Sequence, residues 1–232
     1  MRALLLVLLP VLLCAACGPT GYVQRKDRVY WASYPGSSAF PTLERVEREI
    51  EADPATFRVE PFRDWASDHA LAYYEGRTIG AVDQASFAAR SKALAADRDT
   101  VWLYGEPVPG ADPASFRRLA PPYAIDARNA YSGRLRIEVC DLPSFRVVGE
   151  GIDSFGIDDQ CVFAGTFRVP VEDSASFELL GAGYAGDVIA VYWRQHRIEG
   201  ADQDTFHVPA GMRYGVDKSG CWNGTRPQPC LN

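Results

Sequence analysis

The hexapeptide ADPASF occupies residues 111–116. Close relatives of it occur five more times along the chain, as ADPATF (52–57), VDQASF (82–87), CDLPSF (140–145), EDSASF (172–177) and ADQDTF (201–206). Their closing phenylalanines, separated by steps of 30, 29, 29, 32 and 29 residues, are Phe57, Phe87, Phe116, Phe145, Phe177 and Phe206. A nearly fixed period of this length indicates a repeat architecture, in which neighbouring copies bury a shared core.

An aspartate, here called the opening Asp, keeps the same period. It precedes the closing Phe by 19 residues in all five complete copies, and its positions are Asp68, Asp97, Asp126, Asp158, Asp187 and Asp217. Aromatic side chains recur five residues after it, at offset 5, and a second Asp recurs at offset 15. The variation in length is confined to the stretch that follows each Phe, so the repeated core of every copy has constant length.

Each copy combines a short β-favouring run, a turn that usually contains Gly, and a second run with a β-branched centre, which predicts a β-hairpin. The Asp-x-x-Ser/Thr-Phe phrase then predicts a capped helical turn that buries its Phe. The first copy differs, because PTLERVEREIE places Leu43, Val46 and Ile50 at helical spacing and predicts a short helix near residues 41–51. We therefore expect a mainly β fold, a tandem array of about seven hairpin repeats with short helical turns at the corners.

The N-terminus, MRALLLVLLPVLLCAACGPT, combines one positive charge with an apolar run over residues 3–16. The run is too short to span a bilayer and has the length of a signal-peptide core. Small residues precede Cys17, which resembles the lipobox of bacterial lipoproteins. We expect residues 1–16 to be a signal peptide, Cys17 to be lipidated and residues 17–21 to be a tether; an ordinary secretory signal is the alternative.

Four further cysteines, an even number in an exported protein, favour two disulfides over metal binding. Cys221 and Cys230 have offsets 4 and 13, whereas Cys161 has offset 3 and Cys140, in the copy before, has offset 14. Both pairs sum to 17, as cross-strand partners do if the hairpin turn occupies offsets 8 and 9. We predict the disulfides Cys140–Cys161 and Cys221–Cys230, and no metal site.

The repeated unit resembles the DKNYY family of bacterial repeat proteins, whose units run roughly Tyr-Ala-x-Asp-Lys-x-x-Val-Tyr-Tyr-x-Gly, then an Ile, then Gly-Ala-Asp-x-x-Thr-Phe. Matching stretches here are WASDHALAYYEGRTIGAVDQASF (65–87), LAADRDTVWLYGEPVPGADPASF (94–116) and YAGDVIAVYWRQHRIEGADQDTF (184–206). The Lys after the opening Asp is kept at Lys218 and is often replaced elsewhere. The resemblance implies one repeat domain over residues 22–232. It implies no active site, because the family is similar to those that have no assigned activity.

Few residues suggest chemistry. The histidines His69, His196 and His207 have unrelated offsets and belong to no nucleophile, zinc or phosphate motif, so we expect them on the surface. The repeated Asp residues lack the dense acidic and glycine spacing of calcium-binding solenoids, and Asp is a common turn residue. The aromatic columns favour a core role, whereas Tyr74 and Trp193 face the other way in their strands and are candidates for exposure.

The formal net charge of −6 argues against nucleic acid as a partner. We predict a non-catalytic cell-envelope lipoprotein, lipid-anchored to a bacterial membrane and facing the periplasm or the cell surface. It would act as a binding or scaffolding repeat module without a cofactor, with envelope proteins or glycans as partners. The alternatives are a glycan- or peptidoglycan-binding protein that uses exposed Tyr and Trp, and an envelope hydrolase.

Overall fold

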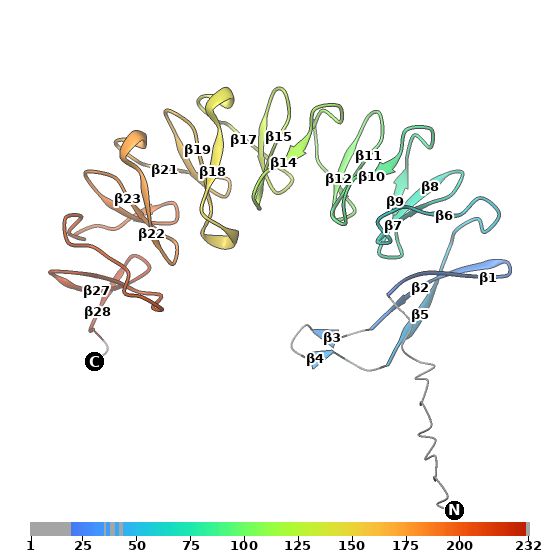
Figure 1. Cartoon of the computed structure of the whole chain (residues 1–232), viewed down its shortest axis with the longest axis horizontal. Coiled ribbons are helices and arrows are strands. Elements are labelled where there is room, and N and C mark those ends of the chain that lie inside the picture. Colours follow the sequence, from blue (N-terminus) through green and yellow to red (C-terminus); the bar gives the residue numbers. More distant parts are fainter. Residues whose placement is uncertain (1–19, 35, 38–39, 42–43, 231–232) are drawn as a thin grey trace, which may run out of the picture. The chain divides into compact units, whose positions relative to one another are not determined.

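The computed structural model describes residues 20–34, 36–37, 40–41 and 44–230 (Figure 1), so the predicted signal peptide and Cys17 lie outside the described residues. The described chain forms seven small antiparallel sheets of three or four strands, and a pair of two-residue strands, β3 (Gly36–Ser37) and β4 (Phe40–Pro41). The prediction of a mainly β array of hairpin repeats is confirmed. Among the described residues, no helix has the length and hydrophobicity needed to cross a membrane.

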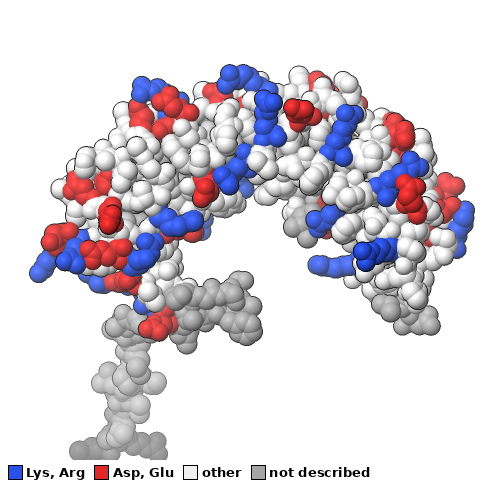
Figure 2. Space-filling model, turned by 180° about the vertical axis from the view of Figure 1, so that it is seen from behind, with Lys and Arg blue, Asp and Glu red and all other residues white. Residues whose placement is uncertain are grey.

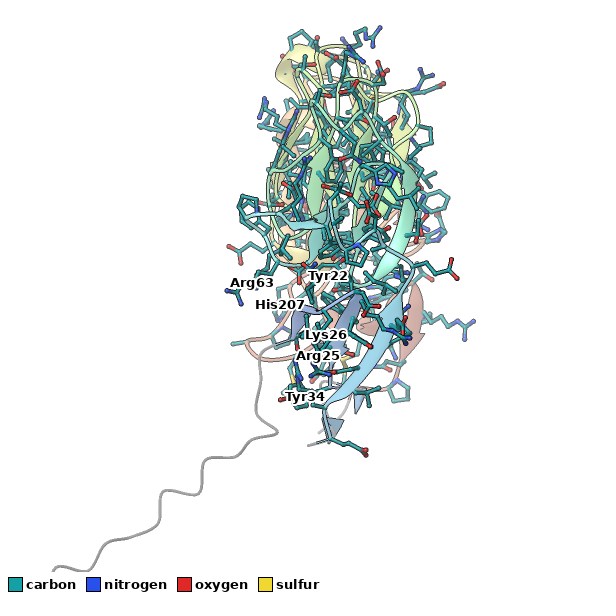
Figure 3. The ribbon with its side chains drawn as sticks, turned by 90° about the vertical axis from the view of Figure 1, so that its right-hand side faces the viewer. Tyr22, Arg25, Lys26, Tyr34, Arg63 and His207 are labelled. Atoms are coloured by element: carbon teal, nitrogen blue, oxygen red, sulfur yellow. A yellow bond between two sulfur atoms is a disulfide. The ribbon has the colours of Figure 1, made fainter. Side chains whose placement is uncertain are left out.

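The chain divides into two compact units, Met1–Ala95 and Ala96–Asn232, and the division falls inside β11 (Leu94–Ala96). Strands of the first unit form the sheets β1-β2-β5 and β6-β7-β8-β9. Their bounds, with that of the short strand that follows them, are β1 (Gly21–Arg25), β2 (Arg28–Ser33), β5 (Val46–Ile50), β6 (Arg58–Val59), β7 (Trp65–Ser67), β8 (Leu71–Tyr74), β9 (Arg77–Ala81) and β10 (Ala88–Ala89). Tyr22, labelled in Figure 3, joins the two sheets, because its hydroxyl donates to the carbonyl of Asp64 and accepts from the N–H of Gly76.

The helix predicted near residues 41–51 is wrong, because Val46–Ile50 is strand β5. It pairs antiparallel with β2, with Ile50 opposite Val29. Ile50 is buried, but Val46 is 44% exposed, so these two residues do not share one buried face, and Leu43 lies outside the described residues. A helix this short gains little stability by itself, whereas pairing with β2 satisfies the backbone along the whole segment.

The division between the units falls within the sheet β10-β11-β12-β13. The second unit also contains four whole sheets, which follow one another in chain order as a row (Figure 1), in the order β14-β15-β16-β17, β18-β19-β20-β21, β22-β23-β24-β25 and β26-β27-β28. Its strands are β12 (Val101–Leu103), β13 (Glu106–Pro107), β14 (Arg117–Arg118), β15 (Tyr123–Ile125), β16 (Ala130–Ser132), β17 (Leu135–Ile137), β18 (Arg146–Val148), β19 (Phe155–Ile157), β20 (Val162–Ala164), β21 (Phe167–Val169), β22 (Glu178–Gly181), β23 (Tyr184–Gly186), β24 (Val191–Trp193), β25 (His196–Arg197), β26 (Gly215–Asp217), β27 (Gly220–Asn223) and β28 (Arg226–Gln228). The corner turns η1 (Leu142–Ser144) and η3 (Ser174–Ser176) lie on one edge of this row, and η2 (Gly151–Asp153) lies on the opposite edge.

The hairpin turns occupy offsets 7 and 8, so the predicted register, with a turn at offsets 8 and 9, is wrong. Tyr131 at offset 5 pairs with Arg136 at offset 10, and their offsets sum to 15. At the tip of the β12–β13 hairpin, Tyr104 and Gly105 have φ values of 53° and 79°. Two-residue turns with both central residues in the left-handed region match the twist of the flanking strands, which explains the tighter register.

Two of the six corners, η1 and η3, are single helical turns, as predicted, and the other four are hydrogen-bonded turns. In η3, the side chain of Asp173 accepts a hydrogen bond from the N–H of Ala175 at 3.0 Å and so caps the turn. Four closing phenylalanines are fully buried (Phe87, Phe116, Phe145 and Phe206), and the other two, Phe57 and Phe177, are half-buried. Burying one such ring contributes about 1.5–3 kcal/mol, so the corners supply a large part of the core.

Candidate functional site

A cavity of about 780 Å³ lies among the hairpin tips of the second unit. Two tips, at residues 164–167 and 193–195, form part of its wall. The rest comes from loops that contain residues 121–122, 151–154 and 183, together with nearby side chains. We call it the first tip cavity, and its volume falls in the range of small-molecule sites in proteins.

A second tip cavity, of about 700 Å³, lies beside the first, and Trp193 lines both. Trp193 is half-buried at the end of β24. A Cβ atom added to Gly224 would lie 3.4 Å from the indole ring, and one added to Gly183 would lie 3.4 Å from the indole nitrogen. The indole therefore packs closely against two glycine backbones, which hold it in place between the cavities.

The opening Asp orients each hairpin. In Asp187, Oδ1 accepts from the N–H groups of Ile189 and Ala190, both at 2.8 Å. Its Oδ2 accepts from the hydroxyl of Tyr192 at 2.8 Å and from the N–H of Glu172, in the preceding corner, at 2.9 Å. One buried carboxylate thus closes the turn into the hairpin, holds the offset-5 aromatic residue and attaches the preceding corner.

Other opening aspartates receive comparable hydrogen bonds, and the pKa values of Asp68 and Asp126 are lowered despite their burial. Burial would raise the pKa of Asp68, but hydrogen bonds from Tyr73 and from three backbone N–H groups outweigh it and lower the pKa to about 2. Burial and the hydrogen bond to Asp126 raise the pKa of Tyr131 to about 12. Because their carboxylate oxygens face N–H and O–H donors, these aspartates serve the structure of the repeat.

Hydroxyl groups of five corners complete this network. Ser115 Oγ accepts from the N–H of Ala127 at 2.9 Å, and Thr205 Oγ1 accepts from the N–H of Lys218 at 3.1 Å. Ser176 makes the equivalent bond at 3.2 Å. The polar groups of the corners are therefore used within the fold, which distinguishes the corners from the tips.

Tyrosines three residues before the opening Asp connect successive copies. The hydroxyl of Tyr123 accepts from the N–H of Gly165 at 2.9 Å and donates to the carbonyl of Phe163 at 2.8 Å. Tyr184 makes the same pair of bonds to the tip at Gly224, at 2.7 and 2.8 Å. Between them, Phe155 occupies the equivalent position without a hydroxyl, and it lines the first tip cavity.

The first tip cavity also coincides with an irregularity in the repeat. The connection from closing Phe to opening Asp has 13 residue steps at Phe145–Asp158, against 10 in the copies before and after it. The longer connection contains η2. Ser154, which follows η2, donates a hydrogen bond from its hydroxyl to the carbonyl of Pro121 at 2.8 Å. The added residues thus form part of the cavity wall, and the step of 32 residues in the sequence was the signal that could have located it.

Exposed apolar side chains occur at successive tips. Tyr104, Leu135 and Phe167 are 55%, 63% and 60% exposed, and Trp193 follows in the next copy. The aromatic columns are buried in contrast, with Trp65, Tyr73, Tyr123, Tyr131, Tyr184 and Tyr192 at most 1% exposed. In the described part of the second unit, the aromatic side chains that are more than half exposed, Tyr104 and Phe167, lie at the tips.

The two aromatic residues predicted to be exposed differ in outcome. Trp193 is half-buried and lies at the cavities, but Tyr74 is only 6% exposed, so the prediction for Tyr74 is wrong. Tyr74 pairs with Trp65 across two strands, and their rings lie 4.5 Å apart. Alternation in a strand assigned Tyr74 to the other face of the hairpin, but packing against Trp65 buries it.

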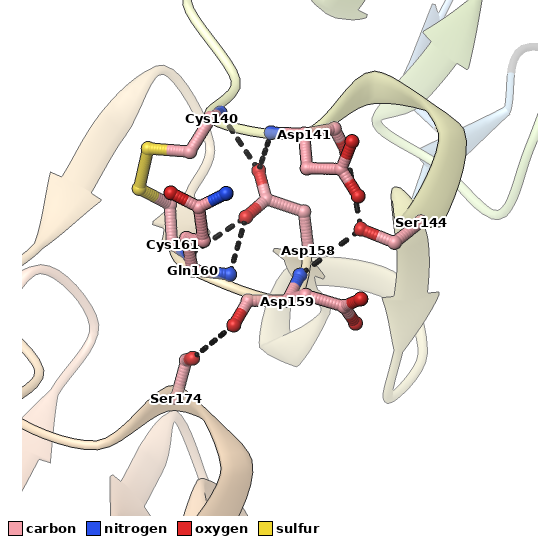
Figure 4. The surroundings of a disulfide bond; sticks show 8 residues. All are labelled: Cys140, Asp141, Ser144, Asp158, Asp159, Gln160, Cys161 and Ser174. Atoms are coloured by element: carbon pink, nitrogen blue, oxygen red, sulfur yellow. Dashed lines mark hydrogen bonds between the residues drawn. A yellow bond between two sulfur atoms is a disulfide. The ribbon is translucent and has the colours of Figure 1, made fainter.

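Both predicted disulfides are present, Cys140–Cys161 and Cys221–Cys230. The register that suggested them is not the observed one, because Cys221 pairs with Gln228, and Cys230 lies beyond the end of β28. Next to the first disulfide, Asp158 accepts four backbone N–H groups, two of them from the cysteines (Figure 4). This disulfide therefore reinforces a junction between copies that the opening Asp already forms.

All three histidines are exposed. His69 contacts Thr56 and Asp53 in a corner, and His207 contacts the carbonyl of Thr205. Only His196 lines a described cavity, the second tip cavity, where Glu199 is the one carboxylate among the lining residues.

Cationic side chains outnumber carboxylates at the second tip cavity. Arg197 and Arg226 line it together with Glu199. Arg197 lies 4.0 Å from Glu199 and 3.8 Å from Glu172, and Arg194 lies at the neighbouring wall. On the face that Figure 2 shows, Lys and Arg are interspersed with Asp and Glu, and the whole chain carries a net charge of −6. An excess of arginines at one cavity therefore differs from the average charge of the chain.

Comparison with known proteins gives one assignment. No curated protein and no solved structure matches the chain. The model of the DKNYY family matches residues 94–226, which is more than half of the 232 residues and includes both tip cavities' hairpins. The repeat of hairpin, opening Asp and closing Phe described above accounts for this match, and the chain belongs to the DKNYY family.

Proposed function

We propose that the chain is a non-catalytic, lipid-anchored repeat module of a bacterial cell envelope, and that it binds its partner through the hairpin tips of the second unit. The observation that carries this proposal is the pair of cavities that meet at Trp193. Repeat proteins commonly bind partners through an extended surface built from equivalent positions of successive copies. The tips provide such positions here.

The two sides of the repeat support the choice of the tips. Corner side chains are engaged in hydrogen bonds within the fold, as the bonds of Ser115 and Thr205 illustrate. The tips carry Leu135 and Phe167 at 63% and 60% exposure, and Phe167 lines the first tip cavity. Val188 and Ile189, beside a corner, are about as exposed but line neither tip cavity. Exposed apolar side chains that recur next to cavities are typical of interaction sites.

Export and anchoring are supported by the sequence and by the disulfides. The apolar run over residues 3–16 ends at Cys17, as in lipoprotein signals. Two disulfides fit an oxidising compartment outside the cytoplasm. A lipid anchor would place the repeat domain at a membrane surface, where envelope proteins and glycans are available as partners.

The binding proposal is tested with mature protein purified from membranes in detergent. Wild type, Trp193→Ala and the control pair Val188→Ser and Ile189→Ser are mixed with delipidated envelope material and sedimented. Val188 and Ile189 are suitable controls because they are apolar and 62% and 55% exposed, but do not line either tip cavity. We expect the wild type and the control to sediment with the envelope and Trp193→Ala to stay in solution. Equal sedimentation of all three, or of none, would contradict the proposal.

The anchor is tested separately with Cys17→Ser in the full-length chain. We expect the wild type to remain in the membrane fraction after a high-salt wash, and the variant to be exported without stable attachment. A variant that stays in the washed membrane to the same extent as the wild type would show that Cys17 is not the anchor.

A further inference from the structure

We infer that the two tip cavities bind an acidic glycan, with Trp193 as the platform for a sugar ring and the surrounding arginines as partners of its anions. This inference rests on the proposed function, because it names the ligand of the same tips.

Trp193 has the properties of a platform. Its position is held by close packing against the backbones of Gly183 and Gly224. It is half-buried and contributes to the walls of both cavities. An indole combines a flat apolar face with a polar N–H, so it packs against the C–H groups of a sugar while hydroxyl groups remain at the edge.

The groups around Trp193 suit the hydroxyl and amide groups of a sugar. Thr166 and Gln195 line the first tip cavity, and Asn223 and Thr225 line the second. Amide and hydroxyl side chains both donate and accept hydrogen bonds, as a polyhydroxylated ligand requires. The core of a protein–protein interface is depleted of charged residues, whereas Arg197, Glu199 and Arg226 line the second tip cavity.

Charge favours an acidic ligand over a neutral one. The guanidinium of Arg194 lies 5.3 Å from the centroid of the Trp193 ring, where a cation is attracted to the ring face. A neutral sugar that stacked on the indole would compete with this contact, whereas an acidic sugar would give the displaced guanidinium a new partner. Arg197 and Arg226 at the second tip cavity add positive charge, although Arg197 also lies near Glu199 and Glu172.

The geometry of the cavities favours a chain of at least two sugar rings. The cavities have about 780 and 700 Å³, and they adjoin at Trp193. Because one side chain belongs to both walls, a ligand that stacks on it extends into both cavities. The repeat irregularity at Phe145–Asp158 and the Phe at position 155 belong to the first cavity only, so the site has two unlike halves suited to a ligand of two unlike units.

Isothermal titration of the mature protein, purified in detergent, tests the inference with three probes. The acidic probe is the disaccharide of N-acetylglucosamine and N-acetylmuramic acid, and the neutral probe is the N-acetylglucosamine dimer. Oligogalacturonate is an acidic probe without N-acetyl groups, so it shows whether acidic groups on a sugar chain are sufficient for binding. We expect the acidic disaccharide to bind about tenfold more tightly than the neutral one at low salt. The difference should shrink in 0.5 M NaCl, because the Debye length is then only about 3–5 Å and salt screens the attraction between the arginines and the acidic group.

The variants separate stacking from charge. We expect Trp193→Ala to weaken binding of the acidic disaccharide at least about tenfold and Trp193→Phe to retain most of it, since Phe keeps a flat ring. Arg226→Gln should weaken the acidic probe several-fold and leave the neutral probe unchanged, and Arg146→Gln, which lies on β18 outside both cavities, should change neither.

Two results would overturn the inference. Equal binding of acidic and neutral probes by the wild type would refute the role of charge. No binding of any probe, combined with tip-dependent sedimentation with the envelope, would show that the tips bind a different envelope component and would leave the proposed function intact. If sedimentation did not depend on Trp193 either, the proposed function itself would fail.

Discussion

The substitution Asp158→Asn tests how the repeat is held together, because it exchanges one oxygen of a buried carboxylate for an NH₂ group. Asp158 is 1% exposed and accepts four backbone N–H groups. Oδ1 receives those of Gln160 and Cys161 at 2.8 and 2.7 Å, and Oδ2 receives those of Cys140 and Asp141 at 2.8 and 3.1 Å (Figure 4). An asparagine retains one pair of bonds and points an NH₂ group at the other pair.

The cost follows from the two N–H groups that lose their acceptor. A buried donor left without a partner costs about 1–3 kcal/mol, and two would cost about 2–6 kcal/mol. Cys140 is exposed and Asp141 is half-buried, so water partly replaces the lost bonds. We therefore expect a loss of about 2–4 kcal/mol in the free energy of unfolding, in the lower part of that range.

Urea unfolding, followed by tryptophan fluorescence with the disulfides intact, measures this loss. With an m-value of about 2 kcal/mol/M, the midpoint should fall by about 1–2 M. The neighbouring substitution Asp159→Asn is the matched control, because Asp159 is exposed and should change stability by no more than about 0.5 kcal/mol. If Asp158→Asn and Asp159→Asn had the same midpoint, the carboxylate would not hold the copies together and the reasoning would be refuted.

Three other predictions follow from the same geometry. The pKa of Asp68 is about 2, below its usual value of 3.8, so its ionised form stabilises the fold above pH 4 and this contribution is lost as the pH falls toward 2. The urea midpoint of the wild type should fall over that range, and more steeply than that of Asp68→Asn. Gly156→Ala should cost about 1–3 kcal/mol in the same assay, because the new Cβ would lie 2.6 Å from the ring of Phe145; a neutral effect would show that the core is not tightly packed there. The paired Cys→Ser changes should cost about 3 kcal/mol at Cys140–Cys161 and about 2.5 kcal/mol at Cys221–Cys230, whose sequence separations are 21 and 9. The reverse order would contradict an effect governed by loop length.

Much of the fold was predictable because the repeat is dictated by local chemistry. A buried carboxylate that must receive N–H groups at fixed offsets keeps Asp187 and its equivalents in place, and a ring that must be buried keeps the closing Phe. Six copies make such a pattern visible in a single sequence. The disulfide partners were found for a related reason, since cysteines at equivalent places in the repeat lie near each other.

What the sequence did not indicate depends on contacts between segments. The turn at offsets 7 and 8 requires φ values above zero in residues such as Tyr104, which composition alone does not reveal. Strand β5 forms because its backbone pairs with the free edge of β2. Tyr74 is buried because its ring packs against that of Trp65.

The tip cavities were missed for the same reason. Their walls come from four copies of the repeat, and only the longer connection at Phe145–Asp158 left a mark in the sequence. Trp193 was singled out by strand alternation, but its arginine neighbours at the cavities were not.

Hydrogen–deuterium exchange of the mature protein, with and without delipidated envelope material, tests most directly whether the tips are the binding surface. The account predicts slower exchange on binding at residues 164–167, 193–195 and 223–226, and unchanged exchange at the corners 112–116 and 173–177. Protection at those corners with none at the tips would contradict it.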